Sequence, residues 1–169
     1  MTFNSTEIDL SSDTPNPLDA VESVLSTYNL DYIRTDDDEL VLSVAGASTS
    51  YRLFLTWQTE FEALQIICQF PAHMNLPDDS TLARLLFTAN AQLWLGHFEL
   101  GEERTMQFRY TTLLQTELPG QGVDYMNDLF KLAVAECDRF YPALHLICVD
   151  PQTSDAALAF AMQDIAGRG

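Results

Sequence analysis

The sequence predicts an α+β domain built on one antiparallel β-sheet of about five strands. Apolar residues recur at helical spacing in four segments, and they alternate with polar residues in five others. The first pattern is typical of amphipathic helices and the second of half-buried strands. The segments follow in the order helix, three strands, helix, two strands, helix, helix. This order lacks the regular strand–helix alternation of a doubly wound parallel sheet.

The first helix is predicted to begin at Asn16 and Pro17. Asparagine is a favoured N-cap, and proline is favoured at the first helical position because its missing N–H is not needed there. The apolar residues that follow at helical spacing are Leu18, Val21, Val24, Leu25 and Tyr28. Residues 1–15 contain little that can pack, so we expect a disordered lead-in followed by a single domain over residues 16–167.

Three strands are predicted between residues 40 and 70. Apolar and polar residues alternate over residues 40–44, 51–57 and 64–70, with loops between the runs. Short connections between such runs favour an antiparallel meander. Phe54 and Ile67 occupy positions that the alternation assigns to the polar face. We therefore expect part of that second face to be covered as well.

The second helix is predicted to open with Leu76-Pro77-Asp78-Asp79, in which two carboxylates in the first turn suit the positive end of the helix dipole. Gly96 is its expected C-terminal cap. Alternation returns over residues 97–100 and 106–114, which predicts a hairpin.

The chain is predicted to end in two helices. The first of these begins near Val123 and kinks or ends at Pro142, because proline lacks the N–H that would bond the carbonyl four residues earlier. The apolar residues 143–149 are able to continue it beyond a kink. Ser154 is the expected cap of the last helix, over residues 155–166.

Composition excludes several classes of partner. Lys and Arg total 8 and Asp and Glu total 25, so the formal net charge is −17. Nucleic-acid and anionic membrane surfaces attract basic proteins, so we expect neither partner. The start of the chain lacks the basic and apolar regions of a secretory signal. Cys68, Cys137 and Cys148 have neither the pairing nor the spacing of a zinc site. We expect free thiols and a cytoplasmic location.

No group of residues indicates a reaction. The sequence contains no nucleophile elbow, phosphate-binding glycine loop or zinc-protease helix motif. We therefore expect no catalytic, cofactor or metal residues and no enzymatic activity. The acidic run 36–39 fails as a calcium loop because Val41 and Ala47 stand where that loop needs glycine and glutamate. It is interpreted as a solvated acidic turn, with weak divalent-cation binding and a partner-facing acidic patch as the alternatives. His97 and Glu99 are expected to share one face of a strand as a surface pair.

A resemblance to a known family adds to this interpretation. The residues that carry it are Pro17-Leu18-Asp19-Ala20-Val21, Leu53-Phe54-Leu55, Gln65-Ile66-Ile67, Asn90, Gly96-His97-Phe98-Glu99-Leu100 and Ser154-Asp155-Ala156-Ala157-Leu158-Ala159. The chain resembles the YbjN family of small bacterial proteins, and its element order is similar to the type III secretion chaperone fold. The resemblance implies a sheet covered by helices and a role in regulating sensory transduction or stress responses. Chaperones of that fold are acidic homodimers that bind extended segments of other proteins. The family has no agreed catalytic residues.

The favoured function is a non-enzymatic protein-binding module, either a chaperone-like escort or a regulatory adaptor. The negative charge, the lack of a reaction motif and a sheet that exposes an edge or an apolar face favour it. The candidate partner-binding residues, for which core packing is the alternative, are Tyr51, Leu53, Trp57, Phe61 and Trp94.

Two further hypotheses stay open. One is a small-ligand sensor with a pocket between the sheet and the kinked helix, and the other is an enzyme with an unrecognised site. Independently of function, the run Leu85-Leu86-Phe87 places bulky side chains on more than one face of the second helix. This pattern favours a homodimer.

Overall fold

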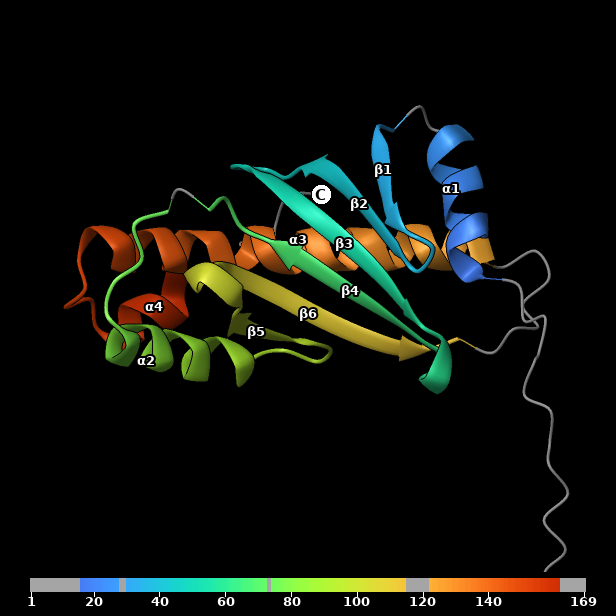
Figure 1. Cartoon of the computed structure of the whole chain (residues 1–169). Helices are drawn as coiled ribbons and strands as arrows, with labels where there is room; N and C mark the ends of the chain where they lie inside the picture. Colours follow the sequence, from blue (N-terminus) through green and yellow to red (C-terminus); the bar gives the residue numbers. More distant parts are fainter. Residues whose placement is uncertain (1–15, 28–29, 73, 115–121, 162–169) are drawn as a thin grey trace, which may run out of the picture.

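A computed structural model of the chain describes residues 16–27, 30–72, 74–114 and 122–161. The elements are α1 (Pro17–Thr27), β1 (Tyr32–Asp36), β2 (Glu39–Ala45), β3 (Ser50–Gln58), β4 (Ala63–Gln69), α2 (Asp79–Asn90), β5 (His97–Leu100), β6 (Met106–Leu113), α3 (Gly122–Val149) and α4 (Asp155–Ala161). The strands form one antiparallel sheet in the order β1-β2-β3-β4-β6-β5, with the helices on one side of it (Figure 1). The predicted α+β class is confirmed. The predicted lead-in at residues 1–15 lies outside the described residues.

The sheet has six strands rather than about five, because β1 was not recognised in the sequence. This strand is short, is irregular between Arg34 and Asp36, and is mostly exposed, so it shows no clear alternation. The acidic run that follows is the turn between β1 and β2, as predicted, with Asp37 exposed at its tip.

Three of the predicted helix starts are confirmed, and each of these three has a local side-chain cap. Oδ1 of Asn16 accepts a hydrogen bond from the Leu18 amide at 2.9 Å. Asp78 accepts from the Ser80 and Thr81 amides, and hydrogen bonds from these two residues lower the pKa of its carboxyl to about 2. Ser154 Oγ accepts from the Ala157 amide at 3.3 Å. The described part of α4 ends at Ala161, and the predicted continuation to residue 166 lies beyond it.

One predicted helix end is corrected, and one open alternative is decided. The helix α2 ends at Asn90, six residues before Gly96, and Gly96 instead leads into β5 with a φ of +69°. A Cβ atom at this glycine would stand 2.6 Å from the Arg109 carbonyl oxygen, so both the backbone conformation and the space require glycine. Of the two alternatives at Pro142, the structure shows continuation, since α3 extends to Val149 as the apolar residues 143–149 allowed.

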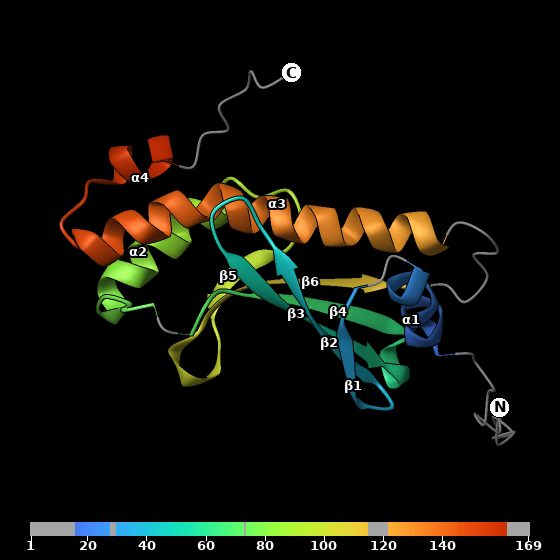
Figure 2. The same ribbon diagram turned by 90° about the horizontal axis from the view of Figure 1, so that it is seen from above.

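The core lies between one face of the sheet and helices α1, α2 and α3 (Figure 2). Aromatic rings fill its centre, where Phe98 stacks on Phe140 with 4.0 Å between ring centroids and Phe70 meets Tyr51 edge-on at 5.2 Å. Beyond Pro142, the α3 residues Ala143, Leu144 and Ile147 are fully buried in the same core.

Asp138 of α3 holds the turn between β2 and β3 against the helix. One carboxylate oxygen accepts a hydrogen bond from the Tyr51 hydroxyl at 2.8 Å, and both oxygens lie 2.9 Å from the Ala47 amide. Burial, the hydrogen bond to Asp138 and the negative charge of that carboxylate raise the pKa of the Tyr51 hydroxyl. The contact joins segments about 90 residues apart, so the sequence pattern did not reveal it.

Candidate functional site

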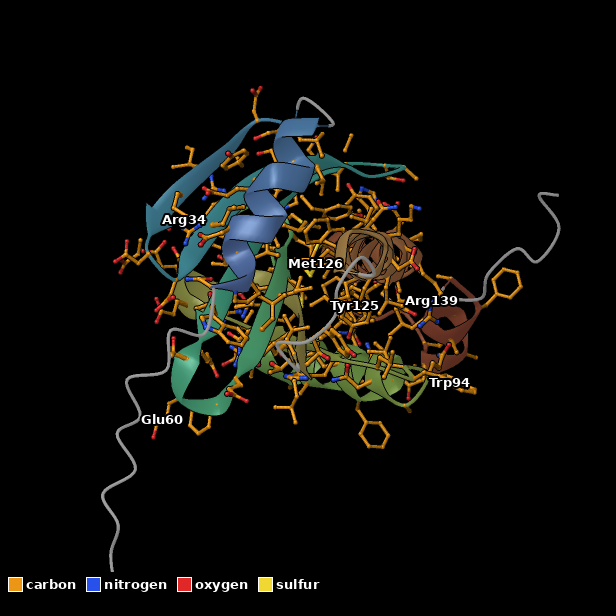
Figure 3. The ribbon with its side chains drawn as sticks, turned by 90° about the vertical axis from the view of Figure 1, so that its right-hand side faces the viewer. Arg34, Glu60, Trp94, Tyr125, Met126 and Arg139 are labelled. Atoms are coloured by element: carbon orange, nitrogen blue, oxygen red, sulfur yellow. The ribbon has the colours of Figure 1, made fainter. Side chains whose placement is uncertain are left out.

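The structure separates the five predicted partner-binding residues into two groups. Tyr51, Leu53 and Trp57 lie on the core face of β3, with 1%, 0% and 4% of their surfaces exposed. A partner that docks on the folded chain does not reach them, so the core alternative holds for these three. Phe61 and Trp94 are 62% and 96% exposed. Figure 3 shows Trp94 at the outer edge of the molecule, far from Met126, which lies between the sheet and α3.

The other face of the sheet carries the larger candidate surface. Figures 2 and 3 show all the described α-helices on the α3 side, so no described α-helix lies over this face. The strand register places one continuous row of apolar side chains on it, from four adjacent strands: Ile33 of β1, Val41 of β2, Phe54 of β3 and Ile67 of β4. We call these four residues the apolar row. Phe54 and Ile67 were the two residues that broke the predicted alternation. The expected partial cover of their face is not provided by any described α-helix.

The apolar row lies at the bottom of a trough that crosses the strands. Two neighbouring hollows, of about 690 and about 740 Å³, lie over the open face, and Glu39 and Phe54 line both of them. The right-handed twist of a sheet makes it saddle-shaped, so a face that is uncovered by helices is concave along one diagonal. We call this concave surface the trough.

Acidic turns border the trough at two corners. The β1–β2 turn carries Asp37 and Asp38, and the β5–β6 turn carries Glu102 and Glu103. Figure 2 shows both turns projecting to the side of the sheet that faces away from α3. The trough therefore combines an apolar floor with acidic borders.

A polar cluster lies in the trough at its β5–β6 end. One oxygen of Glu99 is 2.6 Å from Nη2 of Arg109 and accepts a hydrogen bond from Gln107 Nε2 at 2.7 Å, while the other is 3.3 Å from His97 Nε2. His97 and Glu99 thus share one face, as predicted. Partial burial opposes ionisation of Glu99, but the Gln107 hydrogen bond and the charges of Arg109 and His97 outweigh it and lower the pKa of its carboxyl. Nε of Arg109 is buried without a hydrogen-bond partner.

The edge of the sheet at β5 is closed by a side chain. Asn90 of α2 donates from Nδ2 to the Phe98 carbonyl oxygen at 3.0 Å and accepts at Oδ1 from the Phe98 amide at 2.7 Å. These are the two main-chain groups through which an added strand would pair at this residue. Docking on the open face is therefore better supported than strand addition at β5.

The predicted ligand pocket between sheet and α3 is filled near Pro142. Phe140, Ala143 and Leu144 are fully buried there, and the two hollows described above lie on the opposite face of the sheet. Within the described ranges, no three His, Cys, Asp or Glu side chains are grouped closely enough to hold a metal ion. Cys68, Cys137 and Cys148 are free thiols, the first two fully buried. None of the helices in the described segments has both the length and the apolar character needed to cross a bilayer.

Comparisons with known proteins complete the picture. A search of curated proteins finds no match. A solved structure described as "Crystal structure of YbjN, a putative transcription regulator from E. coli" superposes with a TM-score of 0.48 at 9% sequence identity, covering 74% of this chain and 87% of that one. A family model described as "YbjN: Putative bacterial sensory transduction regulator" matches residues 17–146. The chain belongs to the YbjN family.

Proposed function

We propose that this protein is a non-enzymatic protein-binding module, a regulatory adaptor of the bacterial cytoplasm that binds another protein through the trough. The apolar row on the open sheet face carries this proposal. A contiguous apolar surface bordered by polar residues is typical of protein interaction sites. The regulatory role is suggested by the family description, and the type III secretion chaperone-like fold and mode of action stay predictions.

The apolar row supplies useful binding free energy. Fully burying one Val, Ile or Phe side chain contributes roughly 1.5–3 kcal/mol. Ile33 is exposed and Val41, Phe54 and Ile67 are partly exposed, so covering what remains of all four contributes on the order of 4 kcal/mol. Association entropy opposes this gain, so hydrogen bonds and charge pairs at the borders must contribute as well.

The test is affinity capture from a lysate of the source bacterium with wild type and surface variants. Ile33→Ser and Phe54→Ser remove apolar surface from the trough. Val149→Ser is the matched control, because Val149 is 72% exposed at the end of α3 and Ile33 is 67% exposed in the trough. Trp57→Ala is unsuitable here, since it removes a core side chain.

We expect a protein that wild type and Val149→Ser capture and that both trough variants lose while remaining folded by circular dichroism. A protein captured by all four would show that the trough is not the binding surface. Loss only in a Trp94→Ser variant would instead place the interface at the connection between α2 and β5.

A small-ligand sensor is the second candidate function. The buried, unpartnered Nε of Arg109 beside the hollow of about 690 Å³ favours it. A thermal-shift screen discriminates the two, because a ligand that binds the native state raises the melting temperature. A hit that Arg109→Gln abolishes would favour the sensor.

Self-association is a separate part of the proposal. Phe87 is 81% exposed on α2, away from the trough, and a second copy that covers it would form a homodimer. Sedimentation equilibrium of wild type and Phe87→Ser tests this. We expect a dimer for wild type and a monomer for the variant, and a monomeric wild type would contradict it.

A further inference from the structure

The chemistry of the trough indicates what kind of protein segment fits it. Resting on the proposed function, we propose that the occupant is a basic amphipathic α-helix of another protein, lying across the strands from β1 to β6. Three observations carry this inference: the direction of the apolar row, the hydrogen bonding of the inner strands and the charge of the borders.

The apolar row crosses the strands instead of following one of them. Neighbouring strands are about 4.8 Å apart, so four side chains on adjacent strands extend over about 14 Å. A helix places apolar residues on one face at intervals of one turn, about 5.4 Å, and covers that distance in roughly ten residues. The spacing of the row and the pitch of a helix are therefore similar enough for successive apolar side chains to contact Ile33, Val41, Phe54 and Ile67.

A helix also suits the hydrogen bonding of this face. The backbone groups of the inner strands β2, β3, β4 and β6 are paired within the sheet, so the face offers side chains but no main-chain donors or acceptors. An extended segment laid on it would leave its own backbone groups without partners wherever it is buried. A helix satisfies its backbone internally. Strand addition at β5, one of the two edges of the sheet, meets the Asn90 side chain.

Charge selects a basic partner. The acidic residues on and around the trough are Asp31, Asp36, Asp37, Asp38, Glu39, Glu99, Glu102 and Glu103. The basic residues there are Arg34, Arg52, Arg104 and Arg109. Of these, Arg34, Arg104 and Arg109 each form an ion pair with an acidic side chain of the chain itself.

A second copy of this chain is disfavoured in the trough because it brings the same acidic borders and the same net charge of −17. Lys or Arg residues along the edges of an apolar helix face would meet these carboxylates instead.

The test uses defined peptides, so it does not depend on knowing the natural partner. The probe is a fluorescein-labelled helix of about 18 residues, longer than the 12–15 below which isolated helices are marginal. It carries leucines on one face and lysines beside them. One comparison peptide has glutamate in place of every lysine, and a second has two central prolines that break the helix. Binding is measured by fluorescence anisotropy at low and at physiological ionic strength.

We expect the basic helix to bind at least about tenfold more tightly than either comparison peptide, a difference equivalent to 1.4 kcal/mol. Ile33→Ser and Phe54→Ser should each weaken its binding, and Val149→Ser should not. Glu39→Gln removes one border charge with little change of shape, so it should weaken binding about twofold to fourfold. It should also flatten the salt dependence, because surface charges are screened over about 8 Å at physiological ionic strength.

The outcomes separate this inference from the proposed function. Equal binding of the basic and acidic peptides, or of the helical and proline-broken ones, overturns the inference. If no peptide binds while the lysate experiment yields a trough-dependent partner, the inference fails and the proposed function stands. If neither experiment gives trough-dependent binding, both fail. A wild-type dimer that Ile33→Ser dissociates also overturns the inference, because a second copy would then occupy the trough.

Discussion

The hydrogen bond between Asp138 and Tyr51 makes a sharp prediction about stability. Asp138→Ala removes the acceptor of the Tyr51 hydroxyl, which belongs to a side chain that is only 1% exposed. A hydrogen bond to a charged group contributes about 1.5–3 kcal/mol, and a buried donor left without a partner costs a similar amount. Ala47 is exposed, so its amide finds water instead. We expect the free energy of unfolding to fall by about 2–3 kcal/mol, which lowers the melting temperature by roughly 5–10 °C in a domain of this size.

Urea unfolding with Asp128→Ala as the matched control provides the assay. Asp128 lies on the same helix, but its side chain is 76% exposed and 4.0 Å from Lys131, so its removal should change stability by less than about 0.5 kcal/mol. In a double-mutant cycle, Tyr51→Phe and Asp138→Ala should be strongly non-additive, because each removes the same contact. Equal effects of Asp138→Ala and Asp128→Ala would refute the reasoning.

The same contact predicts a dependence on alkaline pH. Because the pKa of Tyr51 is raised in the folded chain, the protonated hydroxyl stabilises the fold fully below the unfolded value of about 10. That contribution is lost as the pH rises above this value toward the folded pKa. Wild type should therefore lose more stability than Tyr51→Phe between about pH 9 and 11, as measured by urea unfolding at each pH. Parallel curves would contradict the prediction.

Three further predictions follow from the core, the sheet edge and the polar cluster. Trp57→Ala should lower the free energy of unfolding by about 3–5 kcal/mol in urea, since the ring is buried, and a loss below about 1 kcal/mol would argue against its core position. Asn90→Ala leaves the Phe98 N–H and C=O without their side-chain partners. The Phe98 amide should therefore exchange hydrogen faster, and the free energy of unfolding should fall by about 1–3 kcal/mol. Unchanged exchange would show that the edge is closed in another way. The pKa of Glu99 is lowered in the fold, so its ionised carboxylate stabilises the folded chain above the unfolded pKa of about 4.3. That stabilisation is lost as the pH falls through the pKa of Glu99 in the folded chain. Carboxyl NMR titration should therefore give Glu99 a midpoint below that of ordinary glutamate, and Arg109→Gln should raise it; an unchanged midpoint would exclude Arg109 as a cause.

Local chemistry made much of the fold predictable. Asn16 and Ser154 were identified as helix caps because an N-cap satisfies amides only two or three residues away. Asp78 was identified near a helix start by its charge, and the structure adds that it is the N-cap. Helix ends were less predictable. Gly96 was assigned to the end of α2, but its positive φ serves the entry into β5 beside the ring of Phe108, a contact between segments that only the fold brings together.

The candidate site was harder to predict than the strands that form it. Alternation groups the residues of a strand into two faces, but it does not say which face meets the helices. The large residues Tyr51, Leu53 and Trp57 were therefore candidates for a partner surface, although they pack in the core. The two apolar residues on the other parity, Phe54 and Ile67, were read as evidence that their face is covered, although they line the trough.

The sequence by itself determined the class of the fold, the helix starts, the two faces of the strands from β2 to β6 and an acidic surface. These features depend on side-chain type and on spacings of a few residues, and both can be read directly from the amino-acid sequence. Only the tertiary structure decided which face is open, how Ile33, Val41, Phe54 and Ile67 align across four strands, and that Asn90 closes one edge. Each of these depends on strand register and on helix placement. Register and helix placement result from packing between segments that are far apart in the sequence, so no local sequence pattern predicts them.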